Sequence, residues 1–420
     1  MNKNLDSEMK RLSRAAHDAS HVLAGLSDQT KNRILIEMAK SLKANWRVIE
    51  RANQLDLEYA QKEKFATAMQ DRLMLNRERI LKMADSVTQV AKLSDPIGRV
   101  LSKWKRPNGL QISKVSVPLG TILIIYESRP NVTSECASLC FKSGNAVILR
   151  GGKEALHSNR AIAKIYQSVL KKFKLPVSAV TLIETTDRHA IDVLLKLDSW
   201  INLVIPRGGE ALIRRVAENS RIPVIKHYKG ICHVYVDRDA NLEMALKIAF
   251  NAKCQRVSVC NAMETLLVHR LVAKKFLPKY AELLRKANCE IRGDVATREL
   301  IPEAIPAVEE DWSTEYLDKI LSIRVVNSLE EAVEHIQQYG SAHTDAIVTR
   351  NKRAAQEFIS KVDSSSVMLN ASTRFSDGYE YGFGAEIGIS TDKIHARGPM
   401  GLEGLTSYKY VVIGNGQIRS

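Results

Sequence analysis

Ala146-Val-Ile-Leu-Arg-Gly-Gly-Lys153 is an apolar run that ends on two glycines between basic residues, and Ile205-Pro-Arg-Gly-Gly209 repeats the pattern further along the chain. Both lie in residues 120–237, where short apolar runs alternate with amphipathic stretches. The other apolar runs cover residues 121–126, 179–183, 223–226 and 231–236. Strands separated by helical patterns of this length predict right-handed crossovers and a parallel α/β sheet, with a ligand at the carboxyl ends of the strands.

The paired glycines indicate what that ligand is. A residue without a Cβ lets backbone N–H groups approach a phosphate, and the neighbouring arginine or lysine adds positive charge. One Gly-Gly pair after a strand is more often a plain turn, whereas two basic pairs in one sheet favour a nucleotide or phosphate site. We therefore expect a cofactor site at Gly151, Gly152, Gly208 and Gly209.

Composition sets the class of protein. The 420 residues are 45% hydrophobic and 26% charged, which excludes a disordered chain and predicts two or three domains. The net charge of +15 attracts anions, whether phosphate ligands, nucleic acid or acidic lipid. The basic residues are spread over amphipathic helices rather than bunched with aromatic residues, so nucleic-acid binding is not expected as the main role.

The N-terminal ten residues have no apolar core of signal-peptide length, and no apolar run is long enough for a membrane span. We expect a cytoplasmic protein whose six cysteines remain thiols. Cys136 and Cys140 could share a helix face, but no further zinc ligands lie nearby, so no metal site is expected.

The remaining segments also have recognisable patterns. About ninety N-terminal residues have helical spacing, with Ser27 as a candidate N-cap. Residues 100–105 and 110–117 are strand-like and flank a turn that ends on Asn108-Gly109, which predicts a hairpin. Residues 260–390 have a second αβ pattern, and the tail at 405–418 is strand-like.

One cysteine has a setting that favours reactivity. Cys260 lies on a loop between a helical stretch and a strand, with Lys253 and Arg256 close in sequence, where a thiol can be activated as a nucleophile. Cys254 is a rival, and a buried structural thiol is an alternative for either residue.

Several blocks then resemble the gamma-glutamyl phosphate reductase family, a branch of the aldehyde dehydrogenase superfamily, in that family's order and over nearly the whole chain. The blocks are Tyr126-Glu-Ser-Arg-Pro-Asn-Val-Thr133, residues 142–154, Ile205-Pro-Arg-Gly-Gly209, Cys260-Asn261 with Glu264-Thr-Leu-Leu-Val268, Asp363-Ser-Ser-Ser366, Asn370-Ala-Ser-Thr-Arg-Phe375 and His395-Ala-Arg-Gly-Pro-Met-Gly-Leu402.

The resemblance implies an aldehyde dehydrogenase-like α/β fold with a Rossmann-type cofactor domain (residues 1–97 and 118–254), a catalytic domain (255–400) and a small β oligomerisation arm (98–117 and 401–420). It also implies NADPH-dependent reduction of L-glutamate 5-phosphate to the 5-semialdehyde with release of phosphate, in proline biosynthesis. A separate glutamate kinase would supply the substrate, and the arm implies a homodimer or homotetramer. Another acyl-phosphate or aldehyde dehydrogenase on the same fold is the alternative.

By this resemblance, Cys260 attacks the acyl phosphate and forms a thioester that accepts hydride. The backbone N–H of Cys260 and the side chain of Asn131 would stabilise the oxyanion, although an Asx turn after Pro130 is an equal alternative for Asn131. Residues 223–233 contain no equivalent of the superfamily's general-base glutamate.

The resemblance also implies a cofactor set. Arg150 and Lys153 occupy positions that favour a 2′-phosphate, and Arg207 with the glycines at 208 and 209 would meet the pyrophosphate. Gly151 and Gly152 belong to the same turn. Glu315 matches by spacing the glutamate that holds the nicotinamide ribose, or is a solvated carboxylate at a helix end.

An acidic substrate needs cationic and hydroxyl partners. The candidates are Arg129, Arg256, Asn370, Ser372, Thr373 and Arg374. His233 and His395 could assist phosphate binding, or be structural. Two departures from the family, Val257 in place of proline and residues 226–229 in place of a glycine-rich run, bear on the loops beside Cys260.

Overall fold

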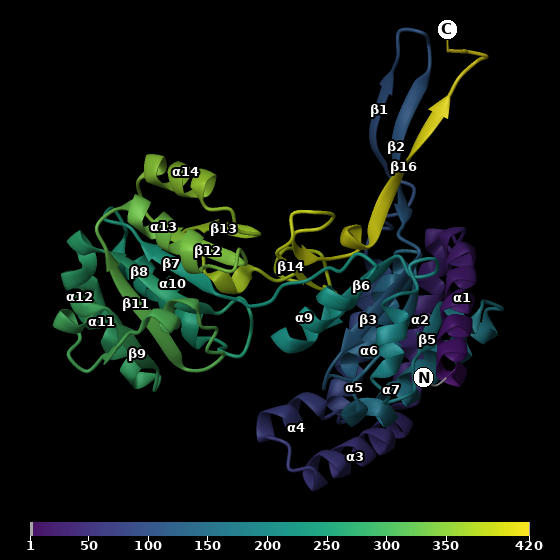
Figure 1. Ribbon diagram of the computed structural model, residues 1–420, viewed down its shortest axis with the longest axis horizontal. Helices are drawn as coiled ribbons and strands as arrows, with labels where there is room; N and C mark the ends of the chain where they lie inside the picture. Colours follow the sequence, from purple (N-terminus) through teal and green to yellow (C-terminus); the bar gives the residue numbers. More distant parts are fainter. Residues whose placement is uncertain (1–2, 420) are drawn as a thin grey trace. The chain divides into compact units, whose positions relative to one another are not determined.

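The computed structural model describes residues 3–419, which divide into two compact units, each described here by itself (Figure 1). The first unit comprises the chain up to Lys226, Gly382–Gly388 and the chain from Met400. The second comprises His227–Tyr381 and Ile389–Pro399. Both contain a parallel sheet with helices, so the predicted α/β class is confirmed.

The first unit holds a parallel sheet in the order β5-β4-β3-β6. Its strands are β3 (Thr121–Tyr126), β4 (Ala146–Arg150), β5 (Val180–Leu182) and β6 (Leu203–Arg207). Every residue of β3 and β4 is buried, as expected for central strands of a covered parallel sheet. The strand expected at 223–226 is only an isolated bridge between Val224 and Val204, because Pro223 has no N–H to donate to a ladder.

Helices account for most of the rest of this unit, and the predicted N-cap Ser27 accepts a hydrogen bond from the N–H of Thr30. They are α1 (Lys3–Ala24), α2 (Asp28–Ala44), α3 (Trp46–Lys62), α4 (Thr67–Leu73), α5 (Arg77–Lys92), α6 (Asn131–Lys142), α7 (Leu156–Lys172), α8 (His189–Leu194) and α9 (Glu210–Asn219), with 3-10 turns η1 (Lys153–Ala155), η2 (Val177–Ala179) and η5 (Glu403–Leu405).

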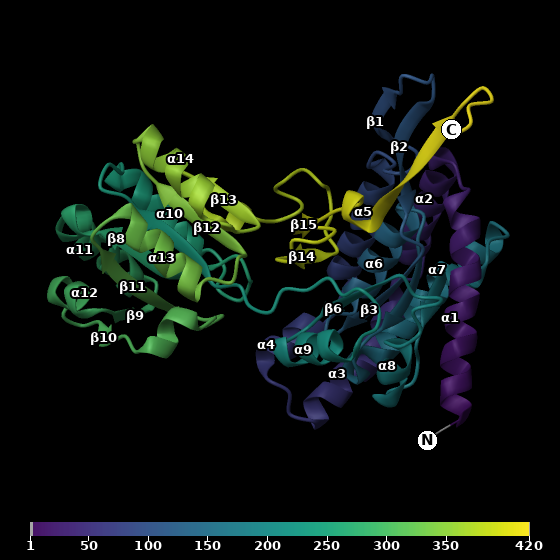
Figure 2. The same cartoon turned by 45° about the horizontal axis from the view of Figure 1, so that its top comes forward.

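The predicted hairpin and tail lie side by side, as Figures 1 and 2 both show. Strand β2 (Gln111–Pro118) pairs antiparallel with β1 (Val100–Lys105) on one edge and with β16 (Thr406–Ile413) on the other. The strand of the tail ends at Ile413 rather than at residue 418. We call these strands the β arm.

The second unit holds a parallel sheet in the order β10-β9-β11-β8-β7-β12-β13. Its strands are β7 (Cys232–Val236), β8 (Met263–His269), β9 (Glu290–Gly293), β10 (Ile305–Pro306), β11 (Ile320–Val326), β12 (Thr344–Val348) and β13 (Ser366–Leu369). Its helices are α10 (Leu242–Cys254), α11 (Arg270–Lys286), α12 (Val295–Leu300), α13 (Leu329–Tyr339) and α14 (Lys352–Lys361), with 3-10 turns η3 (Glu309–Ser313) and η4 (Thr373–Phe375). The short strands β14 (Gly388–Ser390) and β15 (Gly398–Met400) pair where the chain passes between the units.

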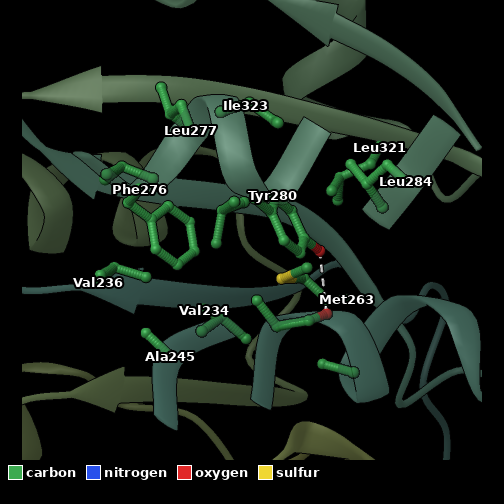
Figure 3. Close-up of a cluster of buried hydrophobic side chains, with 14 of the residues drawn as sticks. Val234, Val236, Ala245, Met263, Phe276, Leu277, Tyr280, Leu284, Leu321 and Ile323 are labelled. Atoms are coloured by element: carbon green, nitrogen blue, oxygen red, sulfur yellow. Dashed lines mark hydrogen bonds between the residues drawn. The ribbon is translucent and has the colours of Figure 1, made fainter. Parts of the chain in front are cut away.

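Two hydrophobic clusters cover the second sheet. In one, shown in Figure 3, α10 and α11 pack on the sheet, and the hydroxyl of Tyr280 donates to the carbonyl of Ala249 at 3.0 Å. In the other, residues of α13 and α14 pack on β7, β8 and β12, and Tyr235 stacks on Phe358.

The predicted boundary between the two main domains, at residues 254 and 255, is wrong. Strand β7 was expected in the first sheet, but it pairs with β8 and β12 in the second, and α10 packs beside it. The sequence pattern reveals a strand without its partners, so it could not place β7. Residues 382–388, expected in the catalytic domain, likewise belong to the first unit.

Two buried histidines should make the stability of the fold sensitive to acid. Burial lowers the pKa of His335 to about 2 and that of His343 to about 3. Each histidine is neutral in the folded protein. Below pH 6.5, each therefore binds a proton when the chain unfolds. The stability that they contribute is therefore present above pH 6.5 and falls below it by about 1.4 kcal/mol per pH unit for each residue. Denaturant melts between pH 7.5 and 5 should show this slope; His343→Gln should flatten it and the exposed control His157→Gln should not.

Candidate active site and cofactor pocket

A pocket of about 460 Å³ lies at the carboxyl ends of β3 and β4 in the first unit, with residues of α8 and α9 also in its lining. Its lining includes Glu127, Arg150, Gly152, Lys153, Arg188 and Arg215. Three predicted cofactor residues, Arg150, Gly152 and Lys153, therefore line one cavity, at the strand ends where ligands of parallel sheets bind. Gly151, Gly208 and Gly209 are not in its lining.

The two predicted cations of this pocket are held differently. Arg150 is almost fully buried, and its guanidinium donates to the carbonyls of Gly151 at 3.0 Å and Thr186 at 3.2 Å. Burial lowers the pKa of Arg150. Lys153 is exposed with its ammonium 5.7 Å from the ring centroid of Tyr59, and a hydrogen bond with this tyrosine raises the pKa of Lys153.

The second glycine pair lies at the start of α9, where the carboxylate of Glu127 accepts from the N–H of Gly209 at 3.1 Å. A Cβ on Gly208 would lie 2.3 Å from this carboxylate, so a larger residue there would displace the side chain of Glu127. A phosphate bound at this helix N-terminus would compete with Glu127 for the N–H of Gly209. Glu127 directly follows β3, and it was not predicted from the sequence as a site residue. Arg207 ends β6, with its guanidinium close to Gly388.

Cys260 lies half-buried in the second unit, on the loop between α10 and β8. Its backbone is packed tightly, because a Cβ on Gly230 would lie 2.0 Å from the carbonyl oxygen of Cys260. The thiol of Cys232 donates to the same oxygen at 3.2 Å. These contacts fix the backbone of the predicted nucleophile.

Predicted substrate residues gather around this loop. Arg374 donates to the side chain of Gln255 at 2.9 Å. Burial lowers the pKa of Arg374, and the charge of Arg256 lowers it further, whereas Cys260 raises it. Asn261 donates to the carbonyl of Ser376 at 2.9 Å and so ties the loop to the Arg374 segment. The structure thus brings Cys260, Arg256 and Arg374 together.

Hydroxyl and amide candidates in the same segment have structural contacts. Ser372 caps the turn η4 by accepting from the N–H of Arg374, and Thr373 is buried. The amide of Asn370 accepts from the N–H of Thr349 and donates to its carbonyl, both at 3.0 Å. Asn370 therefore stabilises the end of β12, a role that spacing alone did not reveal.

Asn131 and Arg129 lie in the first unit. Asn131 is the first residue of α6, and its side chain donates to Glu135 at 2.8 Å rather than forming an Asx turn. Arg129 is exposed just before this helix. Glu315, in the second unit, is half-buried on an irregular segment between η3 and β11 and not at a helix end in solvent.

The remaining candidates, two histidines and Cys254, differ in how deeply they are buried. His233 is fully buried and hydrogen-bonded to Asp345 at 2.7 Å, as a structural histidine would be, whereas His395 is exposed. Cys254 ends α10 and packs against the core cluster that contains Cys289, whose hydrogen bond lowers the pKa of Cys254.

Two further kinds of feature are absent from residues 3–419. No group of three or more histidines, cysteines or acids there could hold a metal ion. None of the helices in that range is long and apolar enough to span a bilayer.

Comparisons with known proteins identify the family and the fold. Residues 2–298 match the model of the aldehyde dehydrogenase family. The gamma-glutamyl phosphate reductase of Nautilia profundicola is 53% identical over 98% of this chain and 100% of its own length. The crystal structure of the Thermotoga maritima gamma-glutamyl phosphate reductase covers 98% of this chain and 100% of its own, with a TM-score of 0.97 and 45% identity. A Methanocaldococcus jannaschii glyceraldehyde-3-phosphate dehydrogenase, complexed with NADP, shares the fold at 16% identity over 98% of this chain and 95% of its own, with a TM-score of 0.68.

Proposed function

Because the chain belongs to the gamma-glutamyl phosphate reductases of the aldehyde dehydrogenase family, we propose that it reduces L-glutamate 5-phosphate to L-glutamate 5-semialdehyde with NADPH and releases phosphate. The observation that carries the proposal is that hydrogen bonds from Arg374 to Gln255 and from Asn261 to Ser376 tie the Arg374 segment to the loop of Arg256 and Cys260. A nucleophilic thiol beside two guanidinium groups suits an acyl phosphate that also carries a carboxylate.

The chemistry follows from these side chains. The sulfur of Cys260 attacks the acyl carbon, the bond from that carbon to the phosphate oxygen breaks, and a thioester forms. The backbone N–H of Cys260 donates to the oxyanion, while Arg256 and Arg374 neutralise the phosphate and carboxylate of the substrate. When bound, NADPH supplies the hydride that reduces the thioester to the aldehyde.

The cofactor pocket suits NADPH through its charges. Arg150, Lys153, Arg188 and Arg215 bring positive charge to its walls, which favours a ligand with three phosphate groups. Neither of its carboxylates, Glu127 and Glu154, lies free: Glu127 accepts from Gly209 and Glu154 from Ser128.

Protection of the thioester from water completes the proposal. A dehydrogenase that hydrolyses its thioester needs a general base, and residues 220–236 contain no aspartate or glutamate. The stretch includes Lys226, His227 and Tyr228, none of which is a carboxylate. The thioester therefore persists until hydride arrives.

The reverse reaction tests this function. NADP⁺ reduction should require both glutamate 5-semialdehyde and phosphate, and a panel of aldehydes without the α-amino and α-carboxylate groups should react at least 100-fold less efficiently. Equal use of simple aldehydes, or reduction that does not need phosphate, would favour another aldehyde dehydrogenase activity on this fold.

Cofactor preference gives a second test. Lys153→Glu should lower the preference for NADPH over NADH by about 10- to 100-fold, because one charge-assisted hydrogen bond to the 2′-phosphate contributes about 1.5 to 3 kcal/mol. The ratio of kcat/KM for the two cofactors measures it, with the exposed residue Lys164→Glu on α7 as the charge-matched control. Equal efficiency of the two cofactors in the unmodified protein would contradict the assignment.

We also propose a cytoplasmic enzyme that forms a homodimer or homotetramer through the β arm and receives its substrate from a separate glutamate kinase. The arm supports the assembly, because Trp104, Tyr408, Tyr410, Val412 and Ile413 are exposed large apolar residues on it.

A further inference from the structure

The loop that carries Cys260 begins and ends beside a buried ion pair. Lys253 lies in the last turn of α10, and Glu264 is the second residue of β8. The ammonium of Lys253 lies 2.5 Å from Oε2 of Glu264, and neither side chain is exposed. The pair therefore joins the two ends of the loop at its base.

Fold stability alone does not explain this pair. Two charges taken out of water lose hydration that their mutual attraction need not restore, and apolar replacements are often equally stable. Burial raises the pKa of Glu264 to about 7 even beside Lys253, which shows how strongly the site disfavours the charge. The pair therefore adds little to the stability of the fold, and the contacts of Glu264 indicate another role.

The second oxygen of Glu264 points to that role. Oε1 accepts from the backbone N–H of Leu317 at 3.3 Å, and Leu317 has a φ of +54°, in the left-handed region that a bulky residue rarely adopts. Strain of this kind persists where surrounding contacts enforce it, and it is common at functional sites. Glu264 thus holds a strained turn in addition to the Cys260 loop.

The same turn carries Glu315 and is fixed from its other side. The hydroxyl of Tyr316 donates to Asp311 at 2.8 Å, and the ammonium of Lys253 lies 5.8 Å from the ring centroid of Tyr316. After burial, which is the main cause, the charge of Glu315 also raises the pKa of Glu264. One ion pair therefore contacts both the nucleophile loop and the Glu315 turn.

We propose that Lys253 and Glu264 are positioning residues that fix the Cys260 loop against the Glu315 turn. This inference rests on the proposed function, because it takes Cys260 as the nucleophile and Glu315 as the partner of the nicotinamide ribose. In this role the pair acts through the Cys260 loop and the Glu315 turn rather than on the substrate. Their contribution is the alignment of thioester and nicotinamide, where a displacement of about 1 Å can cost about 100-fold in rate.

Two variants that preserve side-chain volume test the proposal: Glu264→Gln, and the double variant Lys253→Met/Glu264→Gln. In the reverse reaction, well below the melting temperature, kcat should fall about 10- to 100-fold in each. Alkylation of Cys260 by iodoacetamide, followed by mass spectrometry, should keep its rate within about threefold of the unmodified protein, because the thiol itself is intact. Bound NADP⁺ should change this alkylation rate in the unmodified protein and no longer do so in the variants.

A matched control separates alignment from stability. The pair Lys31 and Asp95 is a largely buried ion pair of the first unit, outside the proposed site. Lys31→Met/Asp95→Asn likewise removes both charges of a pair, and it should leave kcat within about twofold whatever its effect on the melting temperature.

The outcomes distinguish the two proposals. A kcat within twofold of the unmodified protein in Glu264→Gln, or alkylation of unmodified Cys260 that ignores NADP⁺, would overturn the positioning role alone. Activity in Cys260→Ala would overturn the proposed function itself. If Glu264→Gln does not fold because it leaves the charge of Lys253 buried and unpaired, the double variant still gives the answer, because it removes both charges and its glutamine can accept from Leu317.

Discussion

Turnover is lost in Cys260→Ala, by about 10⁴-fold or more, while NADPH still binds with a dissociation constant within about threefold of the unmodified protein. Only a sulfur at this position can hold the acyl group as a thioester, so its removal leaves no covalent route. The cofactor pocket lies in the other unit and keeps its lining. Steady-state kinetics in the reverse direction and fluorescence titration with NADPH measure the two quantities.

The matched control is Cys254→Ala. Cys254 packs against the core cluster of the second unit, so this variant should lose some stability and keep most of its activity. Retained activity in Cys260→Ala, with activity lost in Cys254→Ala, would identify Cys254 as the nucleophile.

Removal of residues 406–420 should convert the oligomer into monomers or aggregates with little activity. This truncation deletes β16, exposes the edge of β2, and keeps Leu405, which is fully buried and accepts from Asn145. Light scattering on the intact protein should give a multiple of the 47.0 kDa protomer.

A milder variant guards against simple misfolding of the truncated chain. Tyr410→Ser/Val412→Ser changes two residues that are 57% and 55% exposed in the single chain, so dissociation without loss of the fold is expected if a partner covers them. Ile418→Ser, 91% exposed and beyond β16, is the control. An intact protein that is an active monomer at micromolar concentration would show that the arm has no role in assembly.

The sequence by itself determined the class of fold and the family. The apolar runs at β3, β4 and β6 are long enough and regular enough to predict a parallel sheet, because buried central strands need continuous apolar residues. The blocks around Cys260 and Arg374 identified the family because they are specific over several adjacent residues. The hairpin and the tail were predicted from turn chemistry and strand pattern, which act locally.

Only the tertiary structure decided which segments meet. Strand β7 has the same apolar pattern as the strands of the first sheet, and its hydrogen bonds to β8 and β12 place it in the second. Asn370 was predicted as a substrate residue, and only the structure shows that its amide also holds the backbone of Thr349. Lys253 and Glu264 stand eleven positions apart with nothing in their spacing to mark them as partners. An ion pair, a strained turn and a hydrogen-bonded carboxylate depend on distances in space, and a pattern along the chain does not contain them.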